Sequence, residues 1–262
     1  MSAEFDGPAH GAANQLSAGS AAAYAAPVDC AVIIPCSNEA ASIGPLVAAV
    51  RAHIPSVVVV DDGSTDETAA IARRAGAEVV SHAVNCGKGA ALRRGLERAR
   101  ELGCSWAVLL DGDGQHAPED LPAFLAVMRA DRADLVVGNR MAAPGAMPFV
   151  RRVTNRVMSA VLSALTGAAL PDTQCGFRLV RMSAWAALSL RCDAFEVESE
   201  MLLAFLAAGR RVEFLPVRCR YKTEQSKIRP LRDTLRWLVW LARSRGAFAR
   251  ARKICGDGLR RA

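Results

Sequence analysis

The stretch from Trp106 to Pro118 constrains the fold of this chain more than any other. Its first five residues, 106–110, are all apolar and stop abruptly at Asp111 and Asp113. A short apolar run bounded by turn residues is typical of a buried strand in a parallel sheet. Ligands of open α/β sheets bind beyond the carboxyl ends of the strands. We therefore expect the two aspartates at a binding site and not in the core.

The remaining sequence repeats this alternation of apolar strands and helices. Strands are predicted at residues 30–35, 56–61, 78–80, 134–138 and 212–221, with helices between them, including 90–102, 118–128, 151–166, 196–208 and 231–242. Strands that alternate with helices of these lengths indicate βαβ units joined by right-handed crossovers. The predicted fold is therefore α/β, with a mostly parallel sheet flanked by helices. Residues 172–178 are expected to form a polar turn before a helical segment around Trp185.

Four polar clusters follow apolar strands and should share one rim of the sheet. They are Asn38-Glu39, Asp61-Asp62, Asp111 with Asp113, and Asn139-Arg140. Any one of them alone could be a solvated loop. Four clusters with carboxylates and an arginine at one edge favour a ligand site.

Composition limits which binding partners and which cellular compartment we expect for this protein. The 262 residues carry a net charge of +7, which favours an anionic partner such as a phosphorylated substrate, nucleic acid or an acidic membrane surface. The eight cysteines include no C-x-x-C pair, which argues against a zinc site and a disulfide framework, so we expect reduced thiols and a cytoplasmic protein. No apolar run reaches the roughly 18–20 residues that span a bilayer, and the start lacks the order of a signal peptide.

Three segments are expected along the chain. Residues 1–27 are rich in Ala, Gly and Ser and predict a disordered leader, residues 28–228 the α/β domain, and residues 229–262 a basic amphipathic C-terminal helix. That helix places Arg232, Arg236 and Arg243 in one wedge opposite Leu231, Leu235, Leu238 and Ala242. It either packs on the domain or lies on an anionic membrane with Trp237 and Trp240 near the headgroups.

The helix at 151–166 is also basic and amphipathic. Its apolar face holds Val153, Val157, Val161, Leu162 and Leu165, opposite Arg151, Arg152, Asn155, Arg156, Ser159 and Ser163. The simplest interpretation is a helix packed on the sheet with its arginines in water.

Six short motifs occur in a fixed order. They are residues 34–39 (Ile-Pro-Cys-Ser-Asn-Glu), 60–66 (Val-Asp-Asp-Gly-Ser-Thr-Asp), 85–90 (Asn-Cys-Gly-Lys-Gly-Ala), 111–118 (Asp-Gly-Asp-Gly-Gln-His-Ala-Pro), 138–140 (Gly-Asn-Arg) and 172–178 (Asp-Thr-Gln-Cys-Gly-Phe-Arg). This set resembles the family-two glycosyltransferases of the GT-A fold, and most of all the branch of dolichyl-phosphate mannose synthases and bacterial polyprenyl-phosphate sugar transferases. The resemblance covers about residues 32–227. Cys36-Ser37 departs from it, since an aromatic is commoner before Asn-Glu.

The resemblance implies a GT-A fold and a site for a GDP- or UDP-linked sugar. The expected nucleotide-sugar-binding residues are Pro35, Asn38, Glu39, Asp61, Asp62, Lys88, Asp111 and Arg140. Asp113 and Gln115 would hold Mg²⁺ or Mn²⁺, and Asp111 would join them or orient the ribose. Lys88 and Arg140 would offset phosphate charge. The absence of G-x-G-x-x-G after the first strand, and of a P-loop motif, argues against dinucleotide and P-loop sites.

The binding site for the sugar acceptor is predicted from a cationic segment late in the chain. Residues 221–227 resemble the branch's basic loop ending in Ser-Lys, so Arg218, Arg220, Ser226 and Lys227 are expected to bind an acceptor phosphate. A phosphate near its second pKa of about 6 needs no general base, whereas a hydroxyl does. Asp172 is the only obvious base for a hydroxyl acceptor. The catalytic set is therefore Asp113, Asp172, Arg140 and Lys227.

The favoured function is an inverting, metal-dependent transfer of sugar to a polyprenyl phosphate at the inner membrane face, with no nucleic-acid partner. Transfer to a saccharide or lipid-headgroup hydroxyl is the alternative within the same chemistry. A non-catalytic nucleotide-sugar-binding protein is another, which the intact Asp111, Asp113, Gln115, Arg140 and Lys227 disfavour. A nucleotidyltransferase would be expected to carry a glycine-rich triphosphate loop after the first strand, where residues 36–39 are Cys-Ser-Asn-Glu.

Overall fold

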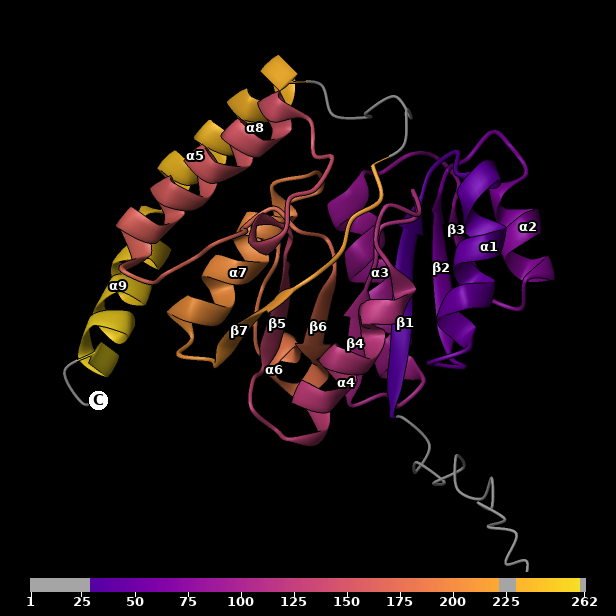
Figure 1. Ribbon diagram of the computed structural model, residues 1–262, viewed down its shortest axis with the longest axis horizontal. Helices are drawn as coiled ribbons and strands as arrows, with labels where there is room; N and C mark the ends of the chain where they lie inside the picture. The colour runs from indigo at the N-terminus through magenta and orange to yellow at the C-terminus, as the bar shows by residue number, and fades with distance from the viewer. Residues whose placement is uncertain (1–28, 222–229, 260–262) are drawn as a thin grey trace, which may run out of the picture.

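A seven-stranded sheet in the order β3-β2-β1-β4-β6-β5-β7 forms the centre of the computed structural model, which describes residues 29–221 and 230–259 (Figure 1). The strands are β1 (Cys30–Cys36), β2 (Val57–Asp62), β3 (Glu78–His82), β4 (Trp106–Leu109), β5 (Leu135–Asn139), β6 (Arg178–Arg181) and β7 (Val212–Pro216). The α/β fold with a mostly parallel sheet is confirmed. The last predicted strand is shorter than expected and ends at Pro216.

The helices cover the sheet and form a layer at the end of the chain. They are α1 (Ala40–Arg51), α2 (Thr68–Arg74), α3 (Lys88–Glu101), α4 (Leu121–Arg129), α5 (Phe149–Thr166), α6 (Met182–Ala186), α7 (Val197–Ala207), α8 (Pro230–Arg243) and α9 (Arg245–Leu259), with short 3₁₀ turns η1 (Pro118–Asp120) and η2 (Arg140–Ala142). In the described part of the chain, no helix is long and apolar enough to cross a bilayer. The predicted leader lies outside the described residues.

The core forms where apolar runs meet closely packed helices. All six residues of β2 are buried: the four valines, as in a strand covered on both faces, and Asp61 and Asp62 after them. Helix α3 packs on β1 and β2. Gly95 permits this approach, because a Cβ there would lie 2.1 Å from Cγ2 of Ile33.

Strand β6 corrects the expected polar turn that ended at Arg178. It enters the sheet between β4 and β5 and is antiparallel to both. Arg178 is only 1% exposed, and its guanidinium donates to the carbonyl oxygens of Thr173, Cys175 and Glu198. A four-residue strand with arginine at each end has too few apolar residues to be recognised in the sequence. Because β6 opposes both neighbours, β4 and β5 remain parallel to each other, and their carboxyl ends share one rim.

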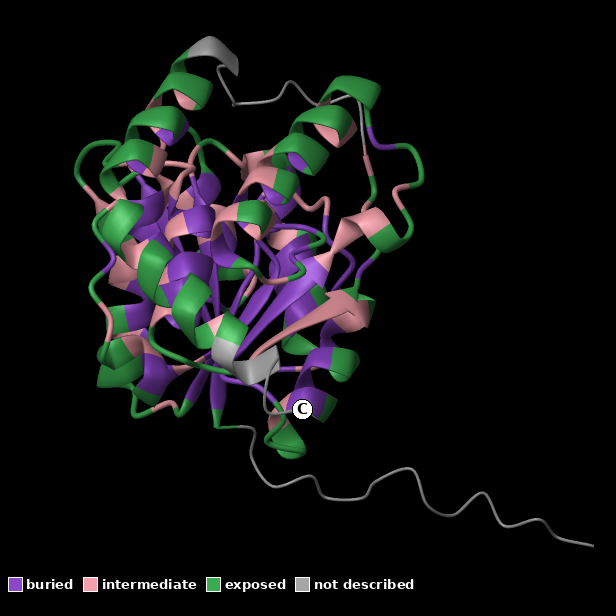
Figure 2. Cartoon of the chain, turned by 90° about the vertical axis from the view of Figure 1, so that its left-hand side faces the viewer, coloured by how far each residue is buried: buried purple, intermediate pink, exposed green. Residues whose placement is uncertain are grey.

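The amphipathic helix α5 turns part of its predicted polar face inward, together with Leu162 of the predicted apolar face. Its buried residues are Asn155, Ser159, Leu162 and Thr166, whereas Val153 and Val157 are 40% and 57% exposed. The polar face packs inward because the turn at residues 172–174 beneath it is polar. Figure 2 shows the mixed exposed and buried faces of the helices at this end of the molecule.

The C-terminal segment is two helices and not one. Helix α9 packs on α7 and α5, and α8 packs on α9. Trp237 and Trp240 are buried, and Trp237 donates its indole N–H to Oγ of Ser199 at 3.0 Å. Of the two alternatives for this segment, the one that places both tryptophans at headgroup level is therefore wrong. Leu235 and Leu238, expected on the packed side, are 63% and 49% exposed.

Candidate functional site

The predicted rim is present, and hydrogen bonds join its loops. The Asn38 amide donates to Oγ of Ser64 at 2.9 Å, and Oδ1 of Asn38 accepts the Thr65 amide at 2.8 Å. The Glu39 amide donates to Oγ1 of Thr68 at 2.7 Å. Asn38 and Glu39, together with Pro35 at the end of β1, therefore border the site on a fixed backbone. Their predicted contacts with a nucleotide sugar remain predictions.

The two aspartates at the end of β2 differ in their surroundings. Oδ1 of Asp61 accepts the Ser64 amide at 3.2 Å. The Asp62 carboxylate accepts the amides of Cys86 and Gly87, both at 2.8 Å, and lies 2.7 Å from Nδ1 of His82. Asp62 therefore holds the loop at residues 85–90 in place, a role that the sequence did not indicate.

Lys88 lies between two carboxylates. Its Nζ is 2.6 Å from Oδ1 of Asp111 and 2.5 Å from Oε1 of Glu198, a residue of α7 that is 5% exposed. Burial lowers the pKa of Lys88, but the two carboxylates outweigh burial and raise it. The sequence predicted Lys88 as a phosphate ligand, and in this structure its ammonium group neutralises protein carboxylates.

Asp111 is compensated on its other side by His116. Nε2 of His116 lies 3.5 Å from Oδ2 of Asp111, and Nδ1 lies 3.6 Å from Sγ of Cys219. Burial lowers the pKa of His116, but the contacts with Asp111 and Cys219 prevail and raise it to about 9. Burial likewise raises the pKa of Asp111, and Lys88 and His116 hold it well below its usual range. Gly176 allows this arrangement, because a Cβ there would lie 2.4 Å from Oδ2 of Asp111.

Asp113 has much less compensation than Asp111. Its Oδ1 accepts the Gln115 amide at 3.0 Å. Burial raises the pKa of the Asp113 carboxyl, and the negative charge of Asp111 raises it further. A carboxylate in this situation is stabilised by a cation.

The donor set around Asp113 fits a hard divalent ion. Asp111 and Asp113 supply carboxylates, and Gln115 supplies an amide oxygen that accepts from Nη1 of Arg151 at 3.0 Å. Among the described residues, the acidic, histidine and cysteine side chains around Asp113 form no closed three-ligand cage. Mg²⁺ and related ions use few protein carboxylates and complete their shell with water and substrate phosphates. An open, oxygen-rich site of this kind suits them.

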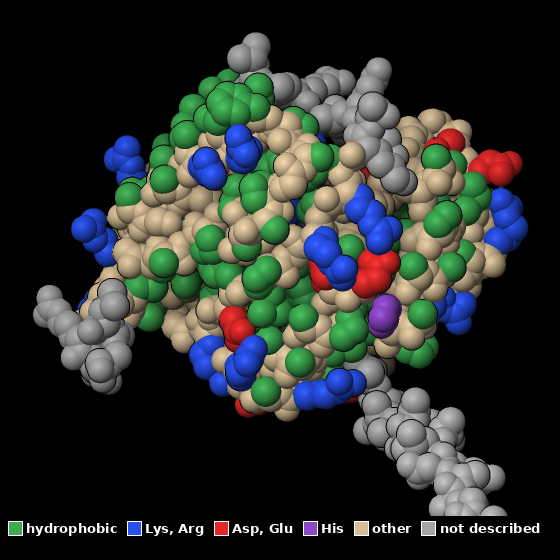
Figure 3. Space-filling model, in the orientation of Figure 1, with side chains coloured by type: hydrophobic (Ala, Val, Ile, Leu, Met, Phe, Trp, Pro, Cys, Tyr) green, Lys and Arg blue, Asp and Glu red, His purple; other side chains and the backbone are tan. Residues whose placement is uncertain are grey.

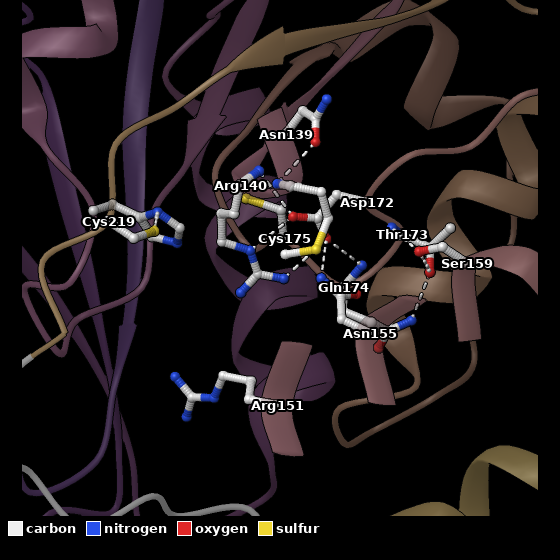
Figure 4. Close-up of polar contacts among 12 residues, drawn as sticks. Asn139, Arg140, Arg151, Asn155, Ser159, Asp172, Thr173, Gln174, Cys175 and Cys219 are labelled. Carbon is white, nitrogen blue, oxygen red and sulfur yellow. Dashed lines mark hydrogen bonds and ion pairs between the residues drawn. The ribbon is translucent and has the colours of Figure 1, made fainter. Parts of the chain in front are cut away.

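Arg140 and Asp172 form a buried pair (Figure 4). Nε and Nη2 of Arg140 donate to the two oxygens of Asp172 at 2.8 and 2.9 Å, and the Arg140 amide donates at 3.0 Å. Asn155 and the Gln174 amide also donate to Asp172, which is fully buried. Burial raises the pKa of Asp172, but the hydrogen bonds and charge of Arg140 lower it below its ordinary value.

The predicted acceptor residues divide into described and undescribed ones. Ser226 and Lys227 lie outside the described residues. Arg218 pairs with Asp120 at 2.7 Å and Arg220 with Glu119 at 3.0 Å. Their roles at an acceptor phosphate remain predictions.

Arg151, at the start of α5, was not among the predicted site residues. Its guanidinium lies over the ring of Tyr221, 5.7 Å from the centroid, and reaches Gln115 as described above. Figure 4 shows it with its guanidinium away from the hydrogen-bonded group around Asp172. Glu198 and Asn155 were not among the predicted site residues either, since each lies within a helix and away from any strand end.

The sequence is similar to a known protein family and to characterised members of it. A family model described as "Glycosyl transferase family 2" matches residues 31–188. The chain is 32% identical over 221 residues to a UDP-N-acetylglucosamine–dolichyl-phosphate N-acetylglucosaminyltransferase of Methanococcus voltae, covering 76% of this chain and 88% of that protein. It is 32% identical over 200 residues to an undecaprenyl-phosphate mannosyltransferase of Micrococcus luteus, covering 71% and 81% respectively.

A solved structure shares the fold at lower identity. It is the glucosyl-3-phosphoglycerate synthase of Mycobacterium tuberculosis in complex with Mn²⁺ and UDP-glucose. The TM-score is 0.63 at 24% identity, with 87% of this chain and 79% of that chain covered. Together with the strand order, this likeness confirms the predicted GT-A architecture.

Proposed function

The chain belongs to glycosyl transferase family 2, and on this basis we propose that it transfers a sugar from a nucleotide sugar to a polyprenyl phosphate, with inversion and with a divalent metal. It is a glycosyltransferase by family. In the proposed reaction an acceptor phosphate oxygen forms a bond to the anomeric carbon while the bond from that carbon to the nucleoside diphosphate breaks. The products are a lipid phosphate sugar and a nucleoside diphosphate.

The donor half of the proposal rests on the carboxylates at the end of β4. Asp113, with Asp111 and Gln115, would hold Mg²⁺ or Mn²⁺. When bound, the ion would offset negative charge on the departing diphosphate. The position of Asp113 after β4 and the negative charge of Asp111 beside it support this role. Asp61, Asn38 and the loop at Ser64 and Thr65, to which Asn38 is hydrogen-bonded, would border the nucleotide.

The acceptor half rests on one observation, the saturation of Asp172. A general base needs a free lone pair within reach of the acceptor proton and a pKa near the working pH. The Asp172 carboxylate is fully buried, accepts from Arg140, Asn155 and Gln174, and has a lowered pKa. The base that a hydroxyl acceptor would use is thus engaged elsewhere. A phosphate acceptor needs no base, because it is already ionised.

The names of the relatives support the same acceptor class. The proteins of Methanococcus voltae and Micrococcus luteus are named for dolichyl phosphate and undecaprenyl phosphate. The charges of Arg140 and Arg151 both act on Tyr221, and two guanidinium groups near one ring suit two phosphorylated substrates. Ser226 and Lys227, which come after Arg218 and Arg220 in the sequence, are proposed to complete the acceptor phosphate site.

We propose that the end of the molecule formed by α5 and α8 contacts an anionic membrane surface. Phe149 and Val150 at the start of α5 are 70% and 75% exposed, and Leu235 of α8 is 63% exposed. Arg156 and Arg232 are exposed on the same helices. Figure 3 shows apolar side chains gathered over the upper ends of these helices, with Lys and Arg beside them. Exposed apolar groups fringed by cations are typical of helices that bind anionic lipid.

The direct test compares two acceptors that differ in one group. Purified protein is incubated with Mn²⁺, radiolabelled UDP- or GDP-sugars, and either a polyprenyl phosphate or the matching polyprenol. We expect label in the lipid fraction with the phosphate and none with the alcohol. Label on the alcohol alone would replace the proposal with a hydroxyl acceptor. Absence of transfer with every donor, while nucleotide-sugar binding persists, would favour a non-catalytic binding protein.

A further inference from the structure

A second group of metal-ligating side chains lies beside the rim, away from Asp113. It consists of Asp62 at the end of β2, His82 at the end of β3 and Cys86 in the loop before α3. One ligand atom from each lies within 4.8 Å of the others. In the described part of the chain, this is the only such group of three His, Cys, Asp or Glu side chains.

Asp62 is fixed in place before any ion arrives. It is 3% exposed, and the amides of Cys86 and Gly87 hold its two oxygens at 2.8 Å each. A carboxylate offers about four lone-pair positions, so these bonds leave room for a further partner. A buried, oriented carboxylate differs from the solvated acids that gather on surfaces without binding anything.

The spacing requires little movement to accept an ion. Oδ1 of Asp62 and Nδ1 of His82 are 2.7 Å apart. With bonds of about 2.0–2.2 Å, two ligands on a tetrahedral zinc ion lie roughly 3.3 Å apart. The pair must therefore open by about half an ångström, which replaces their hydrogen bond with two metal bonds. Cys86 is exposed and its thiol donates to the Val84 carbonyl at 3.3 Å, so it can turn without disturbing the core.

Although the cysteine spacing in the sequence argues against a zinc site, we propose that Asp62, His82 and Cys86 form one that joins β2, β3 and the loop leading to Lys88. A thiolate, an imidazole and a carboxylate are the three ligand types of protein zinc sites, and the open side leaves a fourth position for water. On binding, the thiol proton of Cys86 goes to solvent, and the proton between Nδ1 of His82 and Oδ1 of Asp62 moves to Nε2 of His82 or to solvent. The oxygen ligands around Asp113 suit Mg²⁺ or Mn²⁺ instead, so the two sites differ in metal preference.

The first test uses Co²⁺ as a spectroscopic substitute for zinc on the full-length, chelator-treated protein. Cobalt bound to a thiolate gives a charge-transfer absorption that an oxygen-only site lacks. We expect this band with one equivalent of Co²⁺, and its loss when Zn²⁺ is added. Cys86→Ser should remove the band and weaken zinc binding at least about 10-fold. His82→Gln should weaken binding similarly.

Two variants separate this site from its neighbours. Cys219→Ser is the matched control, because Cys219 is the other thiol beside a histidine, 3.6 Å from Nδ1 of His116. Asp113→Ala tests the predicted magnesium or manganese site. Both should keep the cobalt band. A band that survives Cys86→Ser, or that disappears in Cys219→Ser, overturns the proposal, as does the absence of any thiolate band in the unmodified protein.

Discussion

At the scale of single residues, the Asp-x-Asp motif separates into two carboxylates with different partners. Asp111 faces Lys88 and His116, which compensate its charge within the protein. Asp113 has the Gln115 amide and the negative charge of Asp111 nearby. The two residues are one position apart in sequence, but Asp113 is the one whose charge calls for a cation. We therefore propose that Asp113 would contribute more to binding the metal than Asp111.

Replacing Asp113 by alanine is expected to abolish sugar transfer and leave the fold intact. The lost charge stabilisation at the leaving diphosphate corresponds to several kcal/mol. Initial rates with Mn²⁺ measure the effect, and thermal melting checks the fold. Glu97→Ala is the control, because Glu97 lies in the second half of α3 and its side chain is 48% exposed. Near-normal turnover of Asp113→Ala in the presence of a chelator contradicts the metal-dependent mechanism.

Lys88 and its two carboxylate partners, Asp111 and Glu198, lead us to expect that substitutions of Lys88 and Glu198 affect stability unequally. Lys88→Met leaves Asp111 and Glu198 without their shared cation, whereas Glu198→Gln leaves the Lys88–Asp111 pair intact. Removing one partner of a buried ion pair costs about 3–5 kcal/mol. Urea unfolding should therefore show a much larger loss for Lys88→Met. Equal losses would mean that Lys88 does not hold the two carboxylates together.

At the scale of elements, α5 and α8 expose part of the apolar surface that their sequences suggest they bury. The inward face of α5 is polar because Asn155 donates to Asp172, and Ser159 bonds to Thr173 at 3.2 Å. Helix α8 packs through Trp237 and Trp240 and exposes its leucines. Hydrophobic periodicity alone does not identify the buried face when a helix packs over a polar site.

Adjacent residues of α8 provide a test of this orientation. Trp237 is buried and hydrogen-bonded to Ser199, whereas Leu238 is 49% exposed. Trp237→Ala should cost about 3–5 kcal/mol of unfolding free energy, and Leu238→Ala no more than about 0.5 kcal/mol. Denaturant unfolding of both variants measures the difference. The reverse order would mean that α8 packs through its leucines.

Asp134 joins the ends of β6 and β7 to β5 and makes stability depend on pH. Its oxygens accept from Nε of Arg181 and from the Arg211 amide, both at 2.9 Å. Burial raises the pKa of Asp134, but the bonds and charge of Arg211, with Arg181, lower it below 3.8. A depressed folded-state pKa gives stability that is present above the unfolded pKa and is lost as pH falls through the folded one.

Asp134→Asn should therefore destabilise the protein near neutral pH by about 1.5–3 kcal/mol. The difference from the unmodified protein should shrink once the pH falls well below 3.8, the ordinary value of this carboxyl. Urea unfolding at several pH values gives the comparison. A difference that is independent of pH would assign the effect to packing and not to the charge.

At the scale of the whole molecule, the site and the exposed apolar residues lie toward the same end. Strand β1 rises from the lower edge in Figure 1, so the carboxyl ends of the parallel strands lie at the upper edge, where α5 and α8 begin. A protein that rests on a membrane by these helices would turn its site toward the lipid. This arrangement suits an acceptor whose phosphate lies at the bilayer surface.

We expect binding to anionic vesicles that weakens with salt, with about 1 kcal/mol from each arginine near the surface. Val153→Ser combined with Val157→Ser should weaken it and leave thermal stability nearly unchanged, because both valines are exposed. Leu102→Ser, an exposed apolar position on the loop after α3, is the control. Equal sedimentation with neutral and anionic vesicles, or with neither, contradicts the proposed membrane contact.

The sequence by itself determined the α/β class, the parallel strands and the rim that carries Asp61, Asp111, Asp113 and Arg140. These features are local, since an apolar run specifies a buried strand and the residue that follows it must lie at the strand's end. The six motifs in their fixed order were also enough to identify the family.

Only the tertiary structure decided which charges meet and which faces are buried. Lys88 meets Glu198, and Asp172 meets Arg140, because strands and helices far apart in the chain converge at the rim. The inward face of α5 and the antiparallel insertion of β6 depend on neighbours that no local period encodes. The grouping of Asp62, His82 and Cys86 has the same origin: parallel pairing aligns Asp62 with His82, and the amides of the next loop bond to Asp62.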